Sequence, residues 1–135
     1  MSTRHVVDAH ALIWYLESNA KLGGAAKTIL DDLASNLVLP VIALAEAAHI
    51  VNKGRTRIPS VTDLLTDVIA DPRFEVYPLT FEVLQESLNA LAVPEMHDRL
   101  IVATGLHLQN QGGQVSILTK DADIIASTLL PVIWT

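Results

Sequence analysis

Four carboxylates lie in apolar segments of the sequence, where an ionised group is costly unless it is paired or binds a metal ion. Each stands inside or at the edge of a run rich in Val, Ile, Leu and Ala, with few cations nearby: Asp8, Glu46, Asp98 and Asp121. A divalent ion shared by all four would remove this cost. Mg²⁺ and Mn²⁺ favour carboxylate and water oxygens, so an all-carboxylate set in a chain without cysteine favours these ions over zinc. The placement therefore indicates metal chemistry.

The elements that must position these carboxylates follow from the alternation of short apolar segments with segments of helical period. Strands are expected over residues 5–7, 36–39, 74–79, 115–118 and 132–134. Helices are expected over residues 10–17, 25–34, 61–70, 98–108 and 122–129, with one that has Pro40 in its first turn and runs to about Lys53, and one that Thr80 caps and Pro94 ends. This alternation predicts an α/β fold, a three-layer α/β/α sandwich with a central parallel sheet of about five strands.

Such a sheet offers a way to bring the four carboxylates together. Ligands of open parallel sheets bind beyond the carboxyl ends of the strands, where the strand order reverses. Asp8 follows the first strand and Asp121 the fourth, so both project into one crevice if these strands are neighbours. Glu46 lies about two turns into the helix after the second strand, and Asp98 starts the helix that leads to the fourth. The topology thus permits all four to converge.

Helix capping is the alternative explanation for the aspartates. Asp8 precedes an expected helix and Asp98 starts another, so each could be an N-cap, and Asp121 or Asp123 could cap the short helix before the last strand. Capping does not explain Glu46, which lies in the middle of a helix with alanine at positions 43, 45, 47 and 48. These small neighbours offer no partner, and they would let the helix approach closely and present one long carboxylate.

Length and composition set the remaining limits. The 135 residues are half hydrophobic, which predicts one folded domain over residues 1–135. The longest apolar run falls short of the ~20 residues that span a bilayer, and the first residues do not follow a signal-peptide pattern, so we expect a cytoplasmic protein without membrane association. The net charge of −6 is not the basic footprint of a nucleic-acid-binding protein. Carboxylates that hold a metal ion would account for much of this excess.

Four motifs occur together in an order and spacing that match one protein family. They are VDAHALIWYL (residues 7–16), LAEAAHIV (44–51), HDRLIVAT (97–104) and ILTKDADI (117–124). With them the chain resembles PIN-domain ribonucleases of the VapC toxin type over essentially its whole length. The resemblance implies a PIN-like fold and a Mg²⁺- or Mn²⁺-dependent endoribonuclease that cleaves RNA phosphodiester bonds as the toxin of a toxin–antitoxin pair.

The resemblance also implies roles for single residues. The catalytic acidic positions of the family fall on Asp8, Glu46, Asp98 and Asp121, with Asp8, Asp98, Asp121 and Asp123 as metal ligands. Glu46 would position the attacking water or complete the metal's coordination. Thr119 matches a small hydroxyl beside the site, and His10 either contacts the RNA or is a half-buried structural imidazole. The clustered Lys53, Arg55 and Arg57 either hold the RNA backbone or form an ordinary surface turn.

Partners follow from the same resemblance. It implies a VapB-like antitoxin whose tail covers the acidic site, a single-stranded or structured RNA substrate, and a homodimer. Apolar residues of the first helix either form a groove for the antitoxin or pack in the core: Leu12, Trp14, Tyr15 and Leu16. Helical period also predicts that Val83, Leu84 and Leu88 face the core.

Two other functions fit an α/β chain with aspartates after its strands. A phospho-accepting regulatory domain needs an acceptor aspartate after the third strand, where this chain has Tyr77 and Pro78. A catalytically inactive PIN-like module that binds RNA or protein remains the alternative to the nuclease.

Overall fold

The computed structural model describes residues 2–135, and within them one sheet has five parallel strands. They are β1 (Arg4–Val7), β2 (Asn36–Pro40), β3 (Phe74–Tyr77), β4 (Val115–Leu118) and β5 (Val132–Ile133), in the spatial order β3-β2-β1-β4-β5. The predicted parallel sheet is therefore confirmed. Pro40 is the last residue of β2 and the N-cap of the next helix. It therefore lies one residue before the first helical turn, in which we had expected it.

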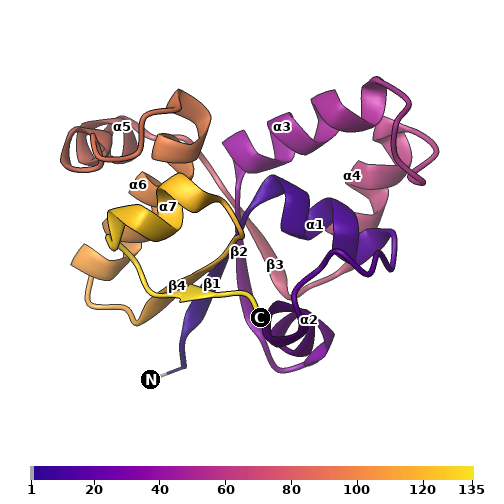
Figure 1. The fold of residues 1–135 in the computed structure, drawn as a ribbon, viewed down its shortest axis with the longest axis horizontal. Helices are drawn as coiled ribbons and strands as arrows, with labels where there is room; N and C mark the ends of the chain where they lie inside the picture. Colours follow the sequence, from indigo (N-terminus) through magenta and orange to yellow (C-terminus); the bar gives the residue numbers. More distant parts are fainter. Residues whose placement is uncertain (1) are drawn as a thin grey trace.

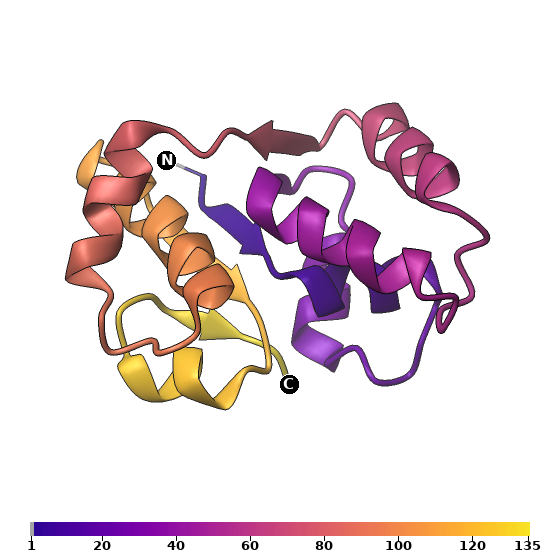
Figure 2. The same ribbon diagram turned by 90° about the horizontal axis from the view of Figure 1, so that it is seen from above.

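Helices cover both faces of this sheet, which confirms the three-layer sandwich (Figure 1). Figure 2 shows α1 to α4 on one side of the sheet and α5 to α7 on the other. Their bounds are α1 (Ala9–Leu16), α2 (Gly24–Asp31), α3 (Val41–Asn52), α4 (Val61–Ala70), α5 (Phe81–Glu86), α6 (Met96–Asn110) and α7 (Ala122–Ser127), with a 3₁₀ turn at Ser87–Asn89 after α5. Helix α3 packs against both α1 and α6, so the two helical layers meet above the sheet.

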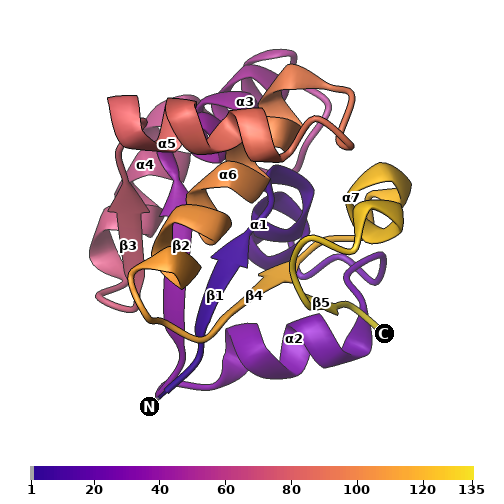
Figure 3. The same cartoon turned by 90° about the vertical axis from the view of Figure 1, so that its left-hand side faces the viewer.

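The strand order reverses at β1, which lies between β2 and β4 (Figure 3). Val7 at the end of β1 is paired with Leu118 at the end of β4, and the Asp8 amide donates to the Leu118 carbonyl at 3.3 Å. The expected neighbourhood of the first and fourth strands is thus confirmed. The residues that follow these two strands emerge side by side at the carboxyl edge, where parallel sheets bind ligands.

The core forms because the central strands are apolar on both faces, as strands covered by two helical layers must be. All four residues of β4 are buried, as are the last four of β2. Side chains from α1, α4 and α6 fill the space on either side, and the largest that are fully buried include Leu12, Leu64, Ile101 and Leu108. Burial of each such side chain contributes about 1.5–3 kcal/mol. This burial stabilises the sheet that positions the carboxylates.

The apolar residues of the first helix pack in the core, which was one of their two expected roles. Leu12 and Trp14 are buried, with exposed fractions of 0% and 9%, and Tyr15 and Leu16 are partly buried against the core.

The expectation for the helix after Thr80 was wrong. Leu84 and Leu88 are 51% and 69% exposed, and only Val83 of the expected three faces the core. The chain tightens into the 3₁₀ turn after Glu86, which turns buried Ser87 inward, where its hydroxyl donates to the Leu84 carbonyl.

None of the helices within residues 2–135 is long and apolar enough to cross a membrane.

Candidate metal centre

Three carboxylates from three helical elements meet at the carboxyl edge of the sheet. Asp8 precedes α1, Glu46 lies in α3 and Asp98 lies in the first turn of α6. One oxygen from each lies within 4.8 Å of the others. A small divalent cation binds oxygen ligands at about 2.1–2.6 Å, so oxygens at this mutual distance are close enough to share one ion after small side-chain movements.

Asp8 is both the N-cap of α1 and a member of this cluster. Its Oδ1 accepts the Ala9 amide at 2.7 Å, and its Oδ2 accepts the Thr119 hydroxyl at 2.6 Å. Only 6% of the residue is exposed. The capping alternative is therefore correct, but it does not exclude metal binding, because a carboxylate has about four acceptor positions and these bonds occupy two.

Glu46 is the member of the cluster that local structure leaves unexplained. It lies in the middle of α3, and its Oε1 is a buried side-chain oxygen for which residues 2–135 provide no hydrogen-bond partner. Ala43 and Ala47, both fully buried on the same helix, let α3 approach the sheet closely. A buried acceptor without a donor costs about 1–3 kcal/mol, and a bound cation would remove that cost. The donor set thus fits a hard divalent ion.

The capping alternative is wrong for Asp98, which is not the N-cap of its helix. Helix α6 begins at Met96, and Glu95 is the cap, with its Oε2 accepting the Asp98 amide at 2.8 Å. The other Glu95 oxygen lies 2.6 Å from Nδ1 of His97. Because Glu95 has taken the capping role, the Asp98 carboxylate is free to face Asp8 and Glu46.

Crowding of these acids shifts their ionisation. Burial, more than any neighbouring charge, raises the pKa of Asp8 and of Glu46 above the usual carboxyl range. Burial and then repulsion from Asp121 and Asp8 raise the pKa of Asp98 to about 7. The cluster is therefore reluctant to hold its full negative charge without a cation.

The cluster lies in a cleft of about 690 Å³, which also contains some of the other predicted residues. His10, Thr119 and Asp121 line it. Asp121 caps α7 by accepting the Ile124 amide at 2.9 Å, and its own amide donates to the Thr119 hydroxyl at 3.0 Å. These bonds hold the loop after β4 against the end of β1.

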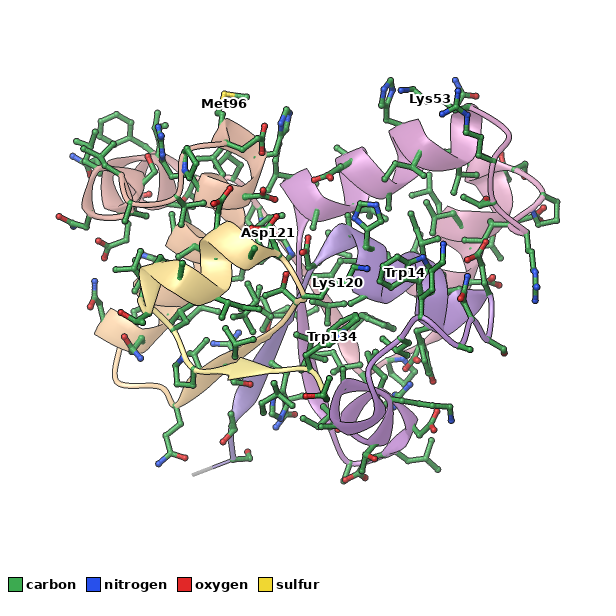
Figure 4. All side chains as sticks on the ribbon, in the orientation of Figure 1. Trp14, Lys53, Met96, Lys120, Asp121 and Trp134 are labelled. Carbon is green, nitrogen blue, oxygen red and sulfur yellow. The ribbon has the colours of Figure 1, made fainter. Side chains whose placement is uncertain are left out.

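Four predicted residues are not among those that line the cleft. Asp123 is exposed in the first turn of α7. Lys53, Arg55 and Arg57 are exposed at and after the far end of α3, where Figure 4 shows Lys53 well away from Asp121. Gly54, with φ of +74°, ends α3 there, as expected from its position. Contact of these basic residues with RNA stays a prediction that would require a long substrate.

The cleft residues that sequence reasoning missed include Trp14, Glu95, Lys120 and Trp134. Glu95 follows Pro94 three residues before Asp98, which is the spacing of an N-cap, but Glu is not a favoured capping residue. Trp134 reaches the cleft because its backbone carbonyl accepts the Ala26 amide at 3.0 Å. That contact needs glycine at position 23, since a Cβ there would lie 2.1 Å from the Trp134 oxygen.

Comparison with known proteins relates this chain to one family. The profile described as PIN domain matches residues 5–127. No curated protein matches the sequence at a significant level.

Several solved structures share the fold at low sequence identity. VapBC2 from Rickettsia felis, solved bound to a DNA fragment of its promoter, gives a TM-score of 0.72 at 12% identity over 98% of this chain and 99% of that one. VapC20 from Mycobacterium tuberculosis, a sarcin–ricin-loop-cleaving toxin, gives 0.68 at 16% identity over 96% and 98%. A toxin–antitoxin complex from Klebsiella pneumoniae gives 0.64 at 16% identity over 93% and 94%. At sequence identities of 12–16%, these similarities show a shared fold alone.

Proposed function

The chain belongs to the PIN domain family, and on this premise we propose that it is a Mg²⁺- or Mn²⁺-dependent endoribonuclease, the toxin of a toxin–antitoxin pair. One observation carries the proposal. Glu46, whose buried Oε1 has no hydrogen-bond partner in the described residues, belongs to a cluster with Asp8 and Asp98 in which one carboxylate oxygen of each residue lies within 4.8 Å of the others. This cluster is unfavourable without a cation, so it would bind a divalent ion, which metal-dependent hydrolysis of a phosphodiester requires.

In this proposal, Asp8, Asp98 and Asp121 hold the metal ion. We favour Asp121 over Asp123 as the fourth acidic residue because Asp121 lines the cleft. A divalent ion, when bound, supplies a Lewis acid that polarises the phosphodiester and lowers the pKa of water. Thr119 keeps the Asp8 carboxylate in place through its hydroxyl. Glu46 would complete the coordination of the ion and so lie beside the attacking water. Burial and then carboxylate repulsion raise the pKa of Asp98, and a divalent cation would offset that repulsion in the ionised cluster.

The substrate and partner are supported by the relatives. VapC20 is a toxin that cleaves the sarcin–ricin loop, which favours RNA as the substrate here. The structure from Klebsiella pneumoniae is a toxin–antitoxin complex, and VapBC2 carries both components in its name, which favours an antitoxin partner. An acidic cleft on a chain of net charge −6 complements a basic antitoxin segment. Such a pair would act in the cytoplasm.

A homodimer is part of the same proposal. Exposed apolar side chains gather along α5 and the segment that leads to α6: Phe81, Leu84, Leu88, Leu91 and Met96. Each of them is more than half exposed, which is unusual for neighbouring large apolar residues on a monomer. Sedimentation should show a dimer that Leu88→Asp converts to a monomer, because the charge would be buried in the interface.

Cleavage of labelled single-stranded RNA in Mn²⁺ tests the nuclease function. The wild type should cut, whereas Asp8→Asn, which keeps the shape of the side chain and an oxygen that can accept the Ala9 amide but removes the charge, should not. Asp123→Asn is the matched control, since it removes an aspartate two residues from Asp121 that does not line the cleft.

If the wild type and Asp8→Asn leave several RNAs equally intact, the nuclease function is rejected. Metal-independent binding of those RNAs by both proteins would then favour the inactive PIN-like module.

A further inference from the structure

The acidic cleft contains one lysine, Lys120, in the loop between β4 and α7. Five carboxylates line the same cleft, yet Lys120 takes no part in the ion pairs found among residues 2–135. Its ammonium lies instead over the ring of Trp14 in α1, 4.6 Å from the ring centre. Figure 4 shows Lys120 beside Trp14, with Trp134 close to both. The cleft's lysine therefore rests on an aromatic ring.

Trp14 belongs to an aromatic group on this wall of the cleft. The His10 ring lies 5.4 Å from it and is tilted, and the Trp134 ring lies 6.0 Å from it, edge to face. Trp14 is buried at 9% exposure, while Lys120 and His10 are exposed. A tryptophan packed this firmly is a fixed support, and the flexible lysine over it is the part that can move.

A phosphate would compete well for this ammonium. Charge-assisted hydrogen bonds from an ammonium to phosphate are stronger than a cation–π contact at a solvent-exposed site. Aromatic rings that become accessible beside a phosphate contact are the usual support for an unpaired base. The acids line the same cleft as this wall, so a strand held there would lie in the cleft that contains the candidate metal centre.

We propose that Lys120 and Trp14 form a nucleotide subsite, in which the Lys120 ammonium leaves Trp14 for a backbone phosphate of single-stranded RNA and the uncovered ring supports an unpaired base. This inference rests on the proposed function, because it assigns the recognition of that substrate to residues beside the acidic cluster. The residues predicted for this role from sequence, Lys53, Arg55 and Arg57, are not among those that line the cleft.

The chain offers a matched control. Lys21 also lies over the Trp14 ring, at 5.9 Å from its centre, but it is not among the residues that line the cleft. Replacing Lys21 removes the same charge from the same aromatic ring. A general loss of positive charge would affect both variants, whereas loss of the subsite would affect only Lys120→Met.

Binding can be followed by fluorescence without any cleavage. The sequence has two tryptophans, so Trp134→Phe leaves Trp14 as the only one. In this background a short oligouridylate is titrated in a buffer that contains a chelator and no divalent ion. We expect it to change the Trp14 emission. Lys120→Met should weaken the affinity about tenfold and reduce the slope of log affinity against log salt by about one, while Lys21→Met changes neither.

Three results would overturn the subsite: no change in Trp14 emission in the parent, equal affinity in Lys120→Met, or an equal loss in Lys21→Met. Cleavage by the wild type in Mn²⁺ is measured separately. Cleavage together with Lys120-independent binding rejects the subsite alone. Lys120-dependent binding without cleavage supports the subsite and rejects the nuclease function alone.

Discussion

The Thr119 hydroxyl donates a 2.6 Å hydrogen bond to the Asp8 carboxylate from the neighbouring strand end, and it accepts the Asp121 amide at 3.0 Å. Thr119 is buried, with 1% exposure, so solvent does not compete for this hydroxyl. One small side chain thus fixes the position of Asp8 and ties the Asp121 loop to the end of β1. In the proposed nuclease it acts as a positioning residue for two metal ligands.

Removing the Thr119 hydroxyl should weaken metal binding while the fold persists. Thr119→Val keeps the volume, but Asp8 loses a donor that holds its carboxylate, and loss of such support for a ligand costs about 10–100-fold in metal affinity. Thr119→Ser should retain most of the affinity because it keeps the hydroxyl. Titration calorimetry with Mn²⁺ measures both variants. Equal heats for Thr119→Val and the wild type would show that Asp8 needs no support from Thr119.

The raised pKa of Asp98 predicts that metal-free protein loses stability as the pH rises. Its pKa is about 4 in the unfolded chain and about 7 in the folded one, so the folded state binds the proton more tightly between these values. The stabilising effect of that proton is complete below about pH 4, falls between pH 4 and 7, and is gone above pH 7. Asp98→Asn removes the effect and should flatten the pH dependence of the unfolding free energy.

Solvent screening reduces the contribution of the raised Asp98 pKa to the free energy of unfolding. Asp98 is only half-buried, so screening reduces the full value of the shift, and we expect Asp98→Asn to be more stable than the wild type by about 1–2 kcal/mol at pH 8. Urea unfolding at pH 5 and pH 8 in chelator measures the difference. Asp123→Asn, which changes an exposed aspartate outside the cleft, should show no such pH-dependent gain. A gain of the same size in both variants would refute the assignment to the cluster.

Glu46→Gln should separate folding from metal binding. Without metal the variant loses one charge from a crowded cluster, so its melting temperature at pH 8 should equal or exceed that of the wild type. Mn²⁺ at 100 times its dissociation constant stabilises a binding protein by about 2.7 kcal/mol, and this gain should be largely absent in Glu46→Gln. Thermal denaturation with and without Mn²⁺ gives both quantities. An undiminished Mn²⁺ shift would remove Glu46 from the metal centre.

Two adjacent glycines should respond in opposite directions to alanine. A Cβ at Gly23 would lie 2.1 Å from the Trp134 carbonyl oxygen, so Gly23→Ala should displace Trp134 from the cleft and cost about 1–3 kcal/mol. A Cβ at Gly24, in the first position of α2, meets nothing within 4 Å. Gly24→Ala should therefore be neutral or stabilise by about 0.5–1 kcal/mol. Denaturant unfolding compares them, and equal effects would mean that the Trp134 contact is not rigid.

Local patterns in the sequence were sufficient for the elements and for the parallel sheet. Helix α4 occupies the predicted range, 61–70, because Ser60 caps it and the apolar positions repeat with helical period. The end of the helix after Thr80 was predicted less well, since a change from α to 3₁₀ geometry depends on how Ser87 packs rather than on the apolar period.

The sequence by itself determined which groups are present: carboxylates in apolar segments, and one of them, Glu46, in a mid-helix position that no capping role explains. Only the tertiary structure decided which of them meet. Asp8 and Thr119 are 111 residues apart and touch because β1 and β4 are neighbours. Lys120 rests on Trp14 for the same reason, and Asp123 turns away because α7 points it to solvent. Such contacts arise from strand order and helix packing, which act over distances that no local sequence pattern records.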